Sequence, residues 1–189
     1  MSTSTTTKTN HSGTSTASAN SAPKLRTTGE SGDDDTTAQL QLVTFGLGEE
    51  EFAVDILKVQ EINRMMSLTR VPSSPPEVEG VINLRGKIIP VVDLRRRFAL
   101  PPAARSPQSR IVVVEVHGRV IGFVVDRVSE VLRISRSIVE PAPSMVCSVD
   151  SDFIEGVGKL EDRLLILLDL GRLFSTAQMS AMAQSAVAA

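Results

Sequence analysis

The residues best suited to catalysis in this sequence are two histidines and one cysteine, and their positions do not bring them together. His11 lies in a polar stretch near the N-terminus, and His117 precedes Gly118 in a predicted hairpin turn that faces solvent. Cys147 is followed by polar residues and has no histidine near it in the sequence. Because a nucleophile needs a base beside it, this pattern predicts no catalytic residue.

The ligands expected at a metal or cofactor site are also missing from the sequence. Cysteine and histidine pairs with the spacing of a zinc site do not occur. Gly46–Leu47–Gly48 precedes a predicted strand, whereas phosphate-binding glycine loops precede a helix. The acidic pairs Glu161–Asp162 and Asp150 with Asp152 fall in predicted turns, where carboxylates are favoured for backbone reasons. We predict no metal, no cofactor and no enzymatic activity.

The composition excludes several classes of partner and favours a β-rich fold. The 189-residue chain has a formal net charge of −2, six Phe, and neither Trp nor Tyr. Nucleic acids require a cationic surface and, for single strands, aromatic stacking, so we predict no nucleic-acid binding. A core of Val, Ile and Leu suits β-structure. The single cysteine and the lack of a long apolar stretch predict a cytoplasmic protein without direct membrane insertion.

The N-terminal segment differs in composition from the rest of the chain. Residues 1–37 are mostly small and polar and bury too little apolar surface to fold, so we predict a disordered tail. From residue 38 onward, short aliphatic runs alternate with turn residues, which is typical of β-strands. The predicted strands lie at 40–45, 51–54, 78–84, 87–94, 110–116, 119–125, 153–160 and 163–170. A C-terminal helix is predicted over 176–189, with Ser175 and Gln178 placed to form a capping box.

The folded part of the sequence contains an internal repeat. Residues 80–98 align with 156–174 without a gap, and Val59–Ile62 matches Val128–Val131. Each half has about 65 residues, a size that is marginally stable alone. Two packed halves with a shared apolar interface would bury more surface, so we expect the halves to associate.

The repeat leads to a specific fold prediction. Closing a small sheet into a barrel removes its exposed edges. We therefore predict an all-β fold of two five-stranded SH3-like β-barrel subdomains, about 38–100 and 101–175, packed together with a groove between them. Pro90 cannot donate a hydrogen bond to a neighbouring strand, so we expect it at an edge or a bulge.

Three blocks of the sequence occur in the order found in a known family. They are Phe52–Ile62, Gly80–Arg95 and Leu164–Leu170. These blocks resemble the CheW-type family of chemotaxis coupling proteins, and the similarity extends over residues 39–185. The resemblance implies one CheW-like domain over 38–175, between the tail and the helix.

The resemblance also implies a function and its partners. Members of this family are non-catalytic adaptors that join chemoreceptors to the histidine kinase CheA in bacterial signal transduction. The adaptor would dock on the regulatory domain of CheA, which has the same fold, and would hold the cytoplasmic tip of a chemoreceptor in the groove between its barrels. This implies a protein that is a monomer when free and is recruited from the cytoplasm to membrane receptor arrays.

Specific residues carry these implied contacts. Arg85 matches an arginine of the family that is important for receptor and kinase coupling, and Glu61 matches the acid that pairs with it. Val59 and Gly80 match positions where substitutions disturb coupling. Asn83 and Gly86 flank Arg85 in the same turn and complete the predicted receptor- and kinase-binding site. The second half has Glu161 at the place of Arg85, so this turn belongs to the first half only.

Several of these residues have a second, purely structural interpretation. Arg85 could be an ordinary hairpin residue, with Gly86 supplying the positive φ angle of the turn. Val128 and Val131, which match Val59 and Ile62 through the repeat, could line the opposite wall of the groove or fill the second core. The run Arg95–Arg97 is expected to be a solvated cluster.

Other functions are compatible with parts of this pattern. The domain could serve a chemosensory system with a non-flagellar output such as pili, or be a module of a CheV-like protein, although no receiver domain fits in this sequence. A small β-barrel enzyme and an RNA-binding barrel are the remaining alternatives, and the missing catalytic groups and near-neutral charge argue against both.

Overall fold

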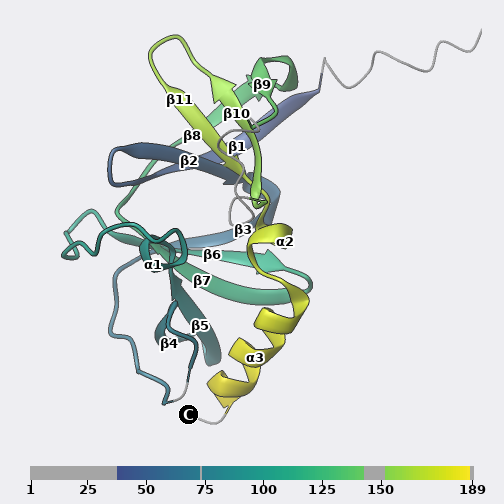
Figure 1. The fold of residues 1–189 in the computed structure, drawn as a ribbon. Helices are drawn as coiled ribbons and strands as arrows, with labels where there is room; N and C mark the ends of the chain where they lie inside the picture. The colour runs from purple at the N-terminus through teal and green to yellow at the C-terminus, as the bar shows by residue number, and fades with distance from the viewer. Residues whose placement is uncertain (1–37, 73, 143–151, 188–189) are drawn as a thin grey trace, which may run out of the picture. The chain divides into compact units, whose positions relative to one another are not determined.

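The computed structural model describes residues 38–72, 74–142 and 152–187, which form two β-sheets and five short or medium helical segments. The predicted N-terminal tail and Cys147 lie outside the described residues. The strands form one sheet of six, which we call sheet A, and one of five, which we call sheet B. Figure 1 shows both sheets. The all-β, two-subdomain prediction is therefore confirmed.

Sheet A is mainly antiparallel and takes strands from both ends of the domain. Its neighbouring strands pair antiparallel except for β2 and β11, which run parallel. In spatial order the strands are β8 (Arg127–Ser135), β1 (Gln39–Leu47), β2 (Glu50–Asp55), β11 (Leu164–Leu168), β10 (Ile154–Lys159) and β9 (Val139–Glu140).

Sheet B has the same plan with one strand fewer. Its parallel pair is β5 with β7, and its other neighbours pair antiparallel. In spatial order the strands are β3 (Val59–Arg64), β6 (Arg110–Val116), β7 (Arg119–Val125), β5 (Lys87–Asp93) and β4 (Val78–Leu84). In both sheets, a central hairpin lies between one edge strand and a second hairpin.

The strand order corrects the predicted division of the chain at residue 100. The hairpin β1–β2 of the first half lies in sheet A among strands of the second half, and the hairpin β6–β7 of the second half lies in sheet B. The two halves thus exchange their first hairpins. Either hairpin offers the same alternating aliphatic pattern to a neighbouring strand, so local periodicity does not specify its partner.

The predicted closure of the two barrels is also not seen in the strand pairing. Among the described residues, the end strands β8 and β9 of sheet A are not paired with each other, and neither are β3 and β4 of sheet B. Sheet A has six strands where five were expected, because the two-residue strand β9 extends it. In sheet B, an isolated bridge between Thr69 and Val81 covers the free side of β4.

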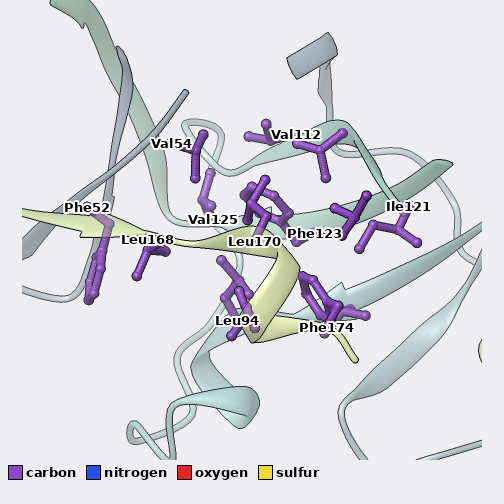
Figure 2. Packing of buried hydrophobic residues seen from close by; sticks show 14 of the residues in the cluster. Phe52, Val54, Leu94, Val112, Ile121, Phe123, Val125, Leu168, Leu170 and Phe174 are labelled. Atoms are coloured by element: carbon purple, nitrogen blue, oxygen red, sulfur yellow. The ribbon is translucent and has the colours of Figure 1, made fainter. Parts of the chain in front are cut away.

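The main apolar cluster joins the two sheets, as the predicted shared interface requires. Figure 2 shows part of this cluster, with Phe123 of sheet B among its side chains. Phe45 of sheet A packs against Phe123 with ring centroids 5.5 Å apart. Phe45 also stacks on Phe52 of the same sheet. Smaller apolar clusters belong mainly to single sheets, among them one around Ile111 and Val113 in sheet B and one around Leu165 and Leu167 in sheet A. The cluster between the sheets contains more buried apolar residues than either of these, and burial of such residues is the main driving force for folding.

Short helices follow the last strand of each half. The helices α1 (Leu94–Arg97) and α2 (Leu170–Leu173) are capped by Asp93 and Asp169, whose carboxylates accept backbone N–H bonds. Two 3₁₀ turns, η1 (Ile56–Lys58) and η2 (Arg136–Ile138), precede β3 and β9.

The predicted C-terminal helix is present as α3 (Thr176–Val187), which packs on β5. Its capping box is also confirmed. Ser175 N donates to Gln178 Oε1 at 3.1 Å, and Gln178 N donates to Ser175 Oγ at 3.3 Å. Met179 and Met182 are buried in the shared cluster, so this helix covers apolar surface of sheet B.

Pro90 lies at a position of β5 where its missing N–H interrupts few strand-to-strand hydrogen bonds. It stands opposite Val81 of β4, one residue before the pairing of β5 with β7 begins at Val91. At this position β5 has a paired strand on one side only. The expectation of an edge-like position for Pro90 agrees with this register.

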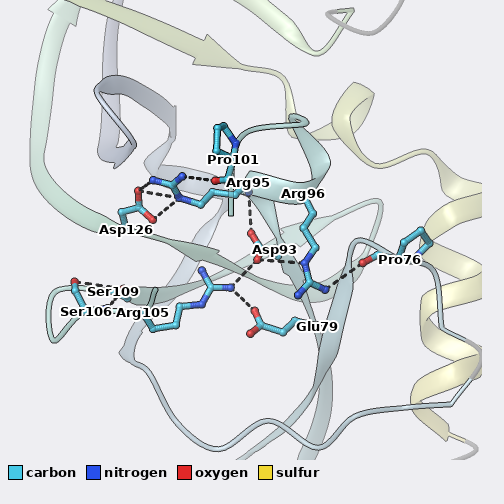
Figure 3. A network of polar contacts seen from close by, with 10 residues as sticks. All are labelled: Pro76, Glu79, Asp93, Arg95, Arg96, Pro101, Arg105, Ser106, Ser109 and Asp126. Atoms are coloured by element: carbon cyan, nitrogen blue, oxygen red, sulfur yellow. Dashed lines mark hydrogen bonds and ion pairs between the residues drawn. The ribbon is translucent and has the colours of Figure 1, made fainter. Parts of the chain in front are cut away.

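The prediction that Arg95–Arg97 form a solvated cluster is wrong for Arg95, whereas Arg96 is 53% exposed. Figure 3 shows Arg95 directed at Asp126, with Nε 2.9 Å from Oδ1, and its side chain is only 12% exposed. Asp126 Oδ2 also accepts the N–H of Gly48 in the β1–β2 turn at 2.8 Å. Arg97 Nη2 donates to Leu173 O at 3.0 Å. The Arg95 bonds therefore tie α1 to the connection between β7 and β8, and the Arg97 bond ties it to α2.

Candidate partner-binding site

Arg85 sits at the tip of the β4–β5 hairpin in a strained backbone conformation. Its φ is 54° and that of Gly86 is 83°, which together define a type I′ turn. The expectation that Gly86 alone would carry the positive φ is therefore incomplete. Asn83 Oδ1 accepts the N–H of Gly86 at 2.9 Å and fixes the turn. A left-handed conformation costs a non-glycine residue about 1 kcal/mol.

The Arg85 side chain projects into solvent and pairs with Glu61, as predicted. Arg85 Nη2 lies 3.1 Å from Glu61 Oε2, and the two side chains are 80% and 27% exposed. The pair joins the hairpin tip to the edge strand β3. Its guanidinium keeps most of its donors free for a partner, while the carboxylate restricts its direction.

A β-bulge in β3 determines which side chains accompany Glu61. Val59 pairs with Val114 and Ile62 with Val112, so Gln60 and Glu61 together oppose a single residue of β6. In a regular strand, residues three apart face opposite sides of the sheet. Here the bulge puts Val59 and Ile62 on the same face, toward the shared apolar cluster. Val59 is partly buried against that cluster, and Ile62 is 40% exposed.

The edge strand β8 of sheet A has the corresponding bulge. Val128 pairs with Phe45 and Val131 with Val43, so Val128 and Val131 also share the face of the apolar cluster. Thr44 fills the bulge, because its hydroxyl lies 3.1 Å from Glu130 O and 3.2 Å from Glu130 N. Val128 packs against the cluster, whereas Val131 is 55% exposed. Of the two interpretations left open by the sequence, core packing therefore applies to Val128, at the margin of the core, and exposure on the surface applies to Val131.

Gly80 has a steric reason to be glycine. A Cβ at this position would lie 2.5 Å from the carbonyl oxygen of Thr69, well inside contact distance. Thr69 and Val81 exchange two backbone hydrogen bonds of 2.8 and 2.9 Å at this point. Gly80 therefore lets the segment after β3 pack on β4, which fixes the base of the Arg85 hairpin. Its part in the site is indirect.

Sequence reasoning missed a second ion pair that matches the first. Glu130, the repeat equivalent of Glu61, pairs with Arg163 at 2.5 Å. Arg163 also lies 3.2 Å from Glu51, and these acids raise its pKa, Glu130 by a direct hydrogen bond and Glu51 by its charge. The alignment of the two halves placed Glu161 at the position of Arg85, so no arginine was expected to pair with Glu130. The useful signal was the Glu61–Glu130 match, since an acid at a bulge needs a cation within reach.

The concavities of the surface do not coincide with the predicted residues. A hollow of about 840 Å³ lies on sheet A, and one of about 480 Å³ lies between the sheets near Lys58, Glu115 and His117. Neither is lined by any of the eight predicted site residues. His117 is exposed, as predicted, and its Nε2 lies 3.0 Å from Gly171 O. The candidate site is therefore a surface of edge strands and a hairpin tip.

Within the described ranges, no group of three or more His, Cys, Asp or Glu side chains could hold a metal ion. In the same part of the chain, no helix is both long and apolar enough to cross a membrane. The site offers ion pairs and aliphatic side chains, which suit binding to another protein.

Comparison with known proteins places this surface in a family. The model of the CheW-like domain matches residues 41–178, well over half of the chain. This chain belongs to the CheW family. The CheW match contains both ion pairs, both bulged strands and the Arg85 turn.

Individual CheW proteins are similar over most of their length. Chemotaxis protein CheW of Klebsiella aerogenes is 38% identical over 144 residues, covering 76% of this chain and 87% of that protein. A probable chemotaxis protein CheW of Rhizobium etli is 35% identical over 141 residues, covering 75% and 91%. The crystal structure of the scaffolding protein TtCheW from Thermoanaerobacter tengcongensis matches with a TM-score of 0.69 and 40% identity, covering 75% of this chain and 96% of that one. The family resemblance noted in the sequence is confirmed.

Proposed function

We propose that this CheW-family chain is a non-catalytic adaptor that couples chemoreceptors to the histidine kinase CheA in chemotaxis. The observation that carries the proposal is the exposed Arg85, held by Glu61 and by the Asn83-capped turn in a chain of this family. No step in this function requires bond chemistry. Its output is a change in the activity of a partner.

The site is suited to hold a receptor tip in one fixed orientation. The turn and Glu61 restrict the Arg85 guanidinium before any partner arrives, which reduces the entropy lost on binding. An arginine presents several donors in a planar fork and can bind a carboxylate or backbone carbonyls of a helical hairpin. Val59, Ile62, Val128 and Val131 would supply apolar contacts from the two bulged edge strands.

The adaptor role requires that the kinase binds elsewhere on the same domain. We propose that the regulatory domain of CheA docks on the domain while the receptor tip occupies the Arg85 surface. Receptor and kinase would then be coupled through one rigid body, so that a change at the receptor alters the free energy of the kinase states. The chain would reach the membrane arrays through these partners.

Substitution of Arg85 tests the proposal in a reconstituted system. Receptor-bearing membranes, CheA and the full chain are mixed, and kinase activity and co-sedimentation are measured. We expect Arg85→Ala to abolish receptor-dependent kinase activation while the free energy of unfolding changes by no more than about 1 kcal/mol, because the pair is exposed.

Arg119 provides a matched control for this experiment. It follows the other type I′ turn, at His117–Gly118, and is also exposed. Arg119→Ala should leave activation intact. Activation by the Arg85→Ala protein equal to that of the original chain would refute the assignment of Arg85.

A further inference from the structure

The Glu130–Arg163 pair repeats the geometry of the Glu61–Arg85 pair on the other sheet. In each case the acid lies at the bulge of an edge strand, and the arginine comes from the hairpin at the far side of the same sheet. Neither pairing is between neighbouring strands. Each therefore spans the sheet from its edge strand to its last hairpin.

Exposed aliphatic side chains lie close to both pairs in the sequence. Five large apolar residues are prominently exposed in the described part of the chain, and four of them are within three residues of a member of these pairs. Ile62 and Ile88 are 40% and 51% exposed, and Val131 and Leu164 are 55% and 60% exposed. The repeat places Ile62 opposite Val131 and Ile88 opposite Leu164 in the alignment. The two halves therefore expose apolar side chains at matched positions.

The two pairs differ in how tightly the arginine is held. Arg85 has one acid and is 80% exposed, whereas Arg163 has two acids and is 36% exposed. Glu51 is the more buried of these acids, at 10%, and needs the arginine as a counter-ion. Glu130 is 47% exposed and does not need the arginine as a counter-ion. Glu130 accepts a hydrogen bond from Arg163, whereas Glu51 lies 3.2 Å from the Arg163 Nε, which has no hydrogen-bond partner among the described residues. The bond to Glu130 therefore ties the β10–β11 hairpin to β8.

That bond acts on the strand that carries Val131. Glu130 is held at its backbone by Thr44 and at its carboxylate by Arg163. Val131 is the next residue and depends on the bulge for its direction. We propose that Glu130 is a positioning residue of the receptor-binding surface, which through Arg163 holds the β8 bulge so that Val131 meets the partner. This inference rests on the proposed function, because its readout is receptor binding.

Neutralising Glu130 tests the proposal in the full chain. Glu130→Gln should weaken binding to receptor-bearing membranes about fivefold, since the ion pair with Arg163 is exchanged for a hydrogen bond to a neutral acceptor. The shorter Glu130→Asp keeps the charge and should bind within about twofold of the original chain. Glu161→Gln makes the same charge change on the Arg163 hairpin, at an exposed side chain, and should have no effect.

A double-mutant cycle separates positioning from general destabilisation. If Glu130 acts through Val131, then Val131→Ala should lose less affinity in the Glu130→Gln background than in the original chain. Independent, multiplying losses would overturn the inference, and so would unchanged binding by Glu130→Gln. Arg85→Ala is measured in parallel. If the Arg85→Ala protein also binds the membranes normally, the proposed function itself fails. If Arg85→Ala loses binding while Glu130→Gln binds normally, only the role of Glu130 is rejected.

Discussion

Two arginines at opposite ends of strand β5 show how burial separates contact surface from framework. Arg85 precedes β5 in the hairpin turn and is 80% exposed, and Arg95 follows β5 in α1 and is 12% exposed. Both pair with a carboxylate, at 3.1 Å for Glu61 and 2.9 Å for Asp126. The two acids are about equally exposed, at 27% for Glu61 and 25% for Asp126, so the pairs differ mainly in how far the arginine is covered. An exposed pair adds little to stability. Similar ion pairs thus leave the arginine open to solvent at one end of the strand and join α1 to the β7–β8 connection at the other.

Removing the buried arginine should have the largest effect on stability. Arg95→Ala leaves Asp126 without its main partner between the sheets, so we expect the free energy of unfolding to fall by about 2–3 kcal/mol. Urea titration followed by circular dichroism measures this loss. At low denaturant, the folded fraction should still activate the kinase. A stability loss equal to that of Arg85→Ala would remove the contrast between the two ends of β5.

A side chain at Gly80 should disturb the base of the Arg85 hairpin. The added methyl group would meet the Thr69 carbonyl at 2.5 Å, so we expect Gly80→Ala to cost about 1–3 kcal/mol. Gly158→Ala is the matched control, because its Cβ would have no neighbour closer than 3.7 Å. Thermal unfolding of both variants checks the difference. Equal melting temperatures would contradict this prediction, because they would mean that the segment at Thr69 moves away from the added methyl group without loss of stability.

The stabilisation by the Arg95–Asp126 pair should also depend on pH. It should change only under acid conditions and stay constant near neutral pH. The hydrogen bond from Arg95 lowers the pKa of Asp126 below its ordinary value of 3.8. Since the folded state has the lower pKa, the stabilisation is complete above the ordinary value and is lost as the pH falls through the lowered one. The stability difference between the original chain and Asp126→Asn should therefore be constant from pH 7 to about 5 and narrow below about 4. Urea midpoints across this range provide the measurement, and narrowing near pH 7 would contradict it.

Local features of the fold were predictable because they depend on nearby residues. The strands alternate or run aliphatic, the turns contain glycine, and the helix at Thr176 begins with a capping box. The Arg85–Glu61 pair followed from the family resemblance. The exchange of hairpins was not predictable, because β1–β2 and β6–β7 have interchangeable patterns and their partners are far away in the chain.

The errors at charged residues share one physical cause. Arg95 was expected in solvent, since three consecutive arginines usually face water, and only the fold brings Asp126 against it. Arg163 was missed because its pairing crosses sheet A between residues 33 positions apart. Side-chain length lets an arginine reach a carboxylate from more than one position of a hairpin. Matching the repeat residue by residue therefore found Glu161 and overlooked Arg163.

The exchanged hairpins determine the order in which the domain can be completed during synthesis. All strands of sheet B lie between residues 59 and 125, so this sheet can assemble while the chain is still growing. Sheet A must wait, because Phe52 in β2 pairs with Ile166 in β11 near the end of the domain. Until then, Phe45 can already pack on Phe123 of sheet B, but the side of β2 that later pairs with β11 has no neighbouring strand. The nascent protein therefore carries an unpaired strand edge that a chaperone could bind.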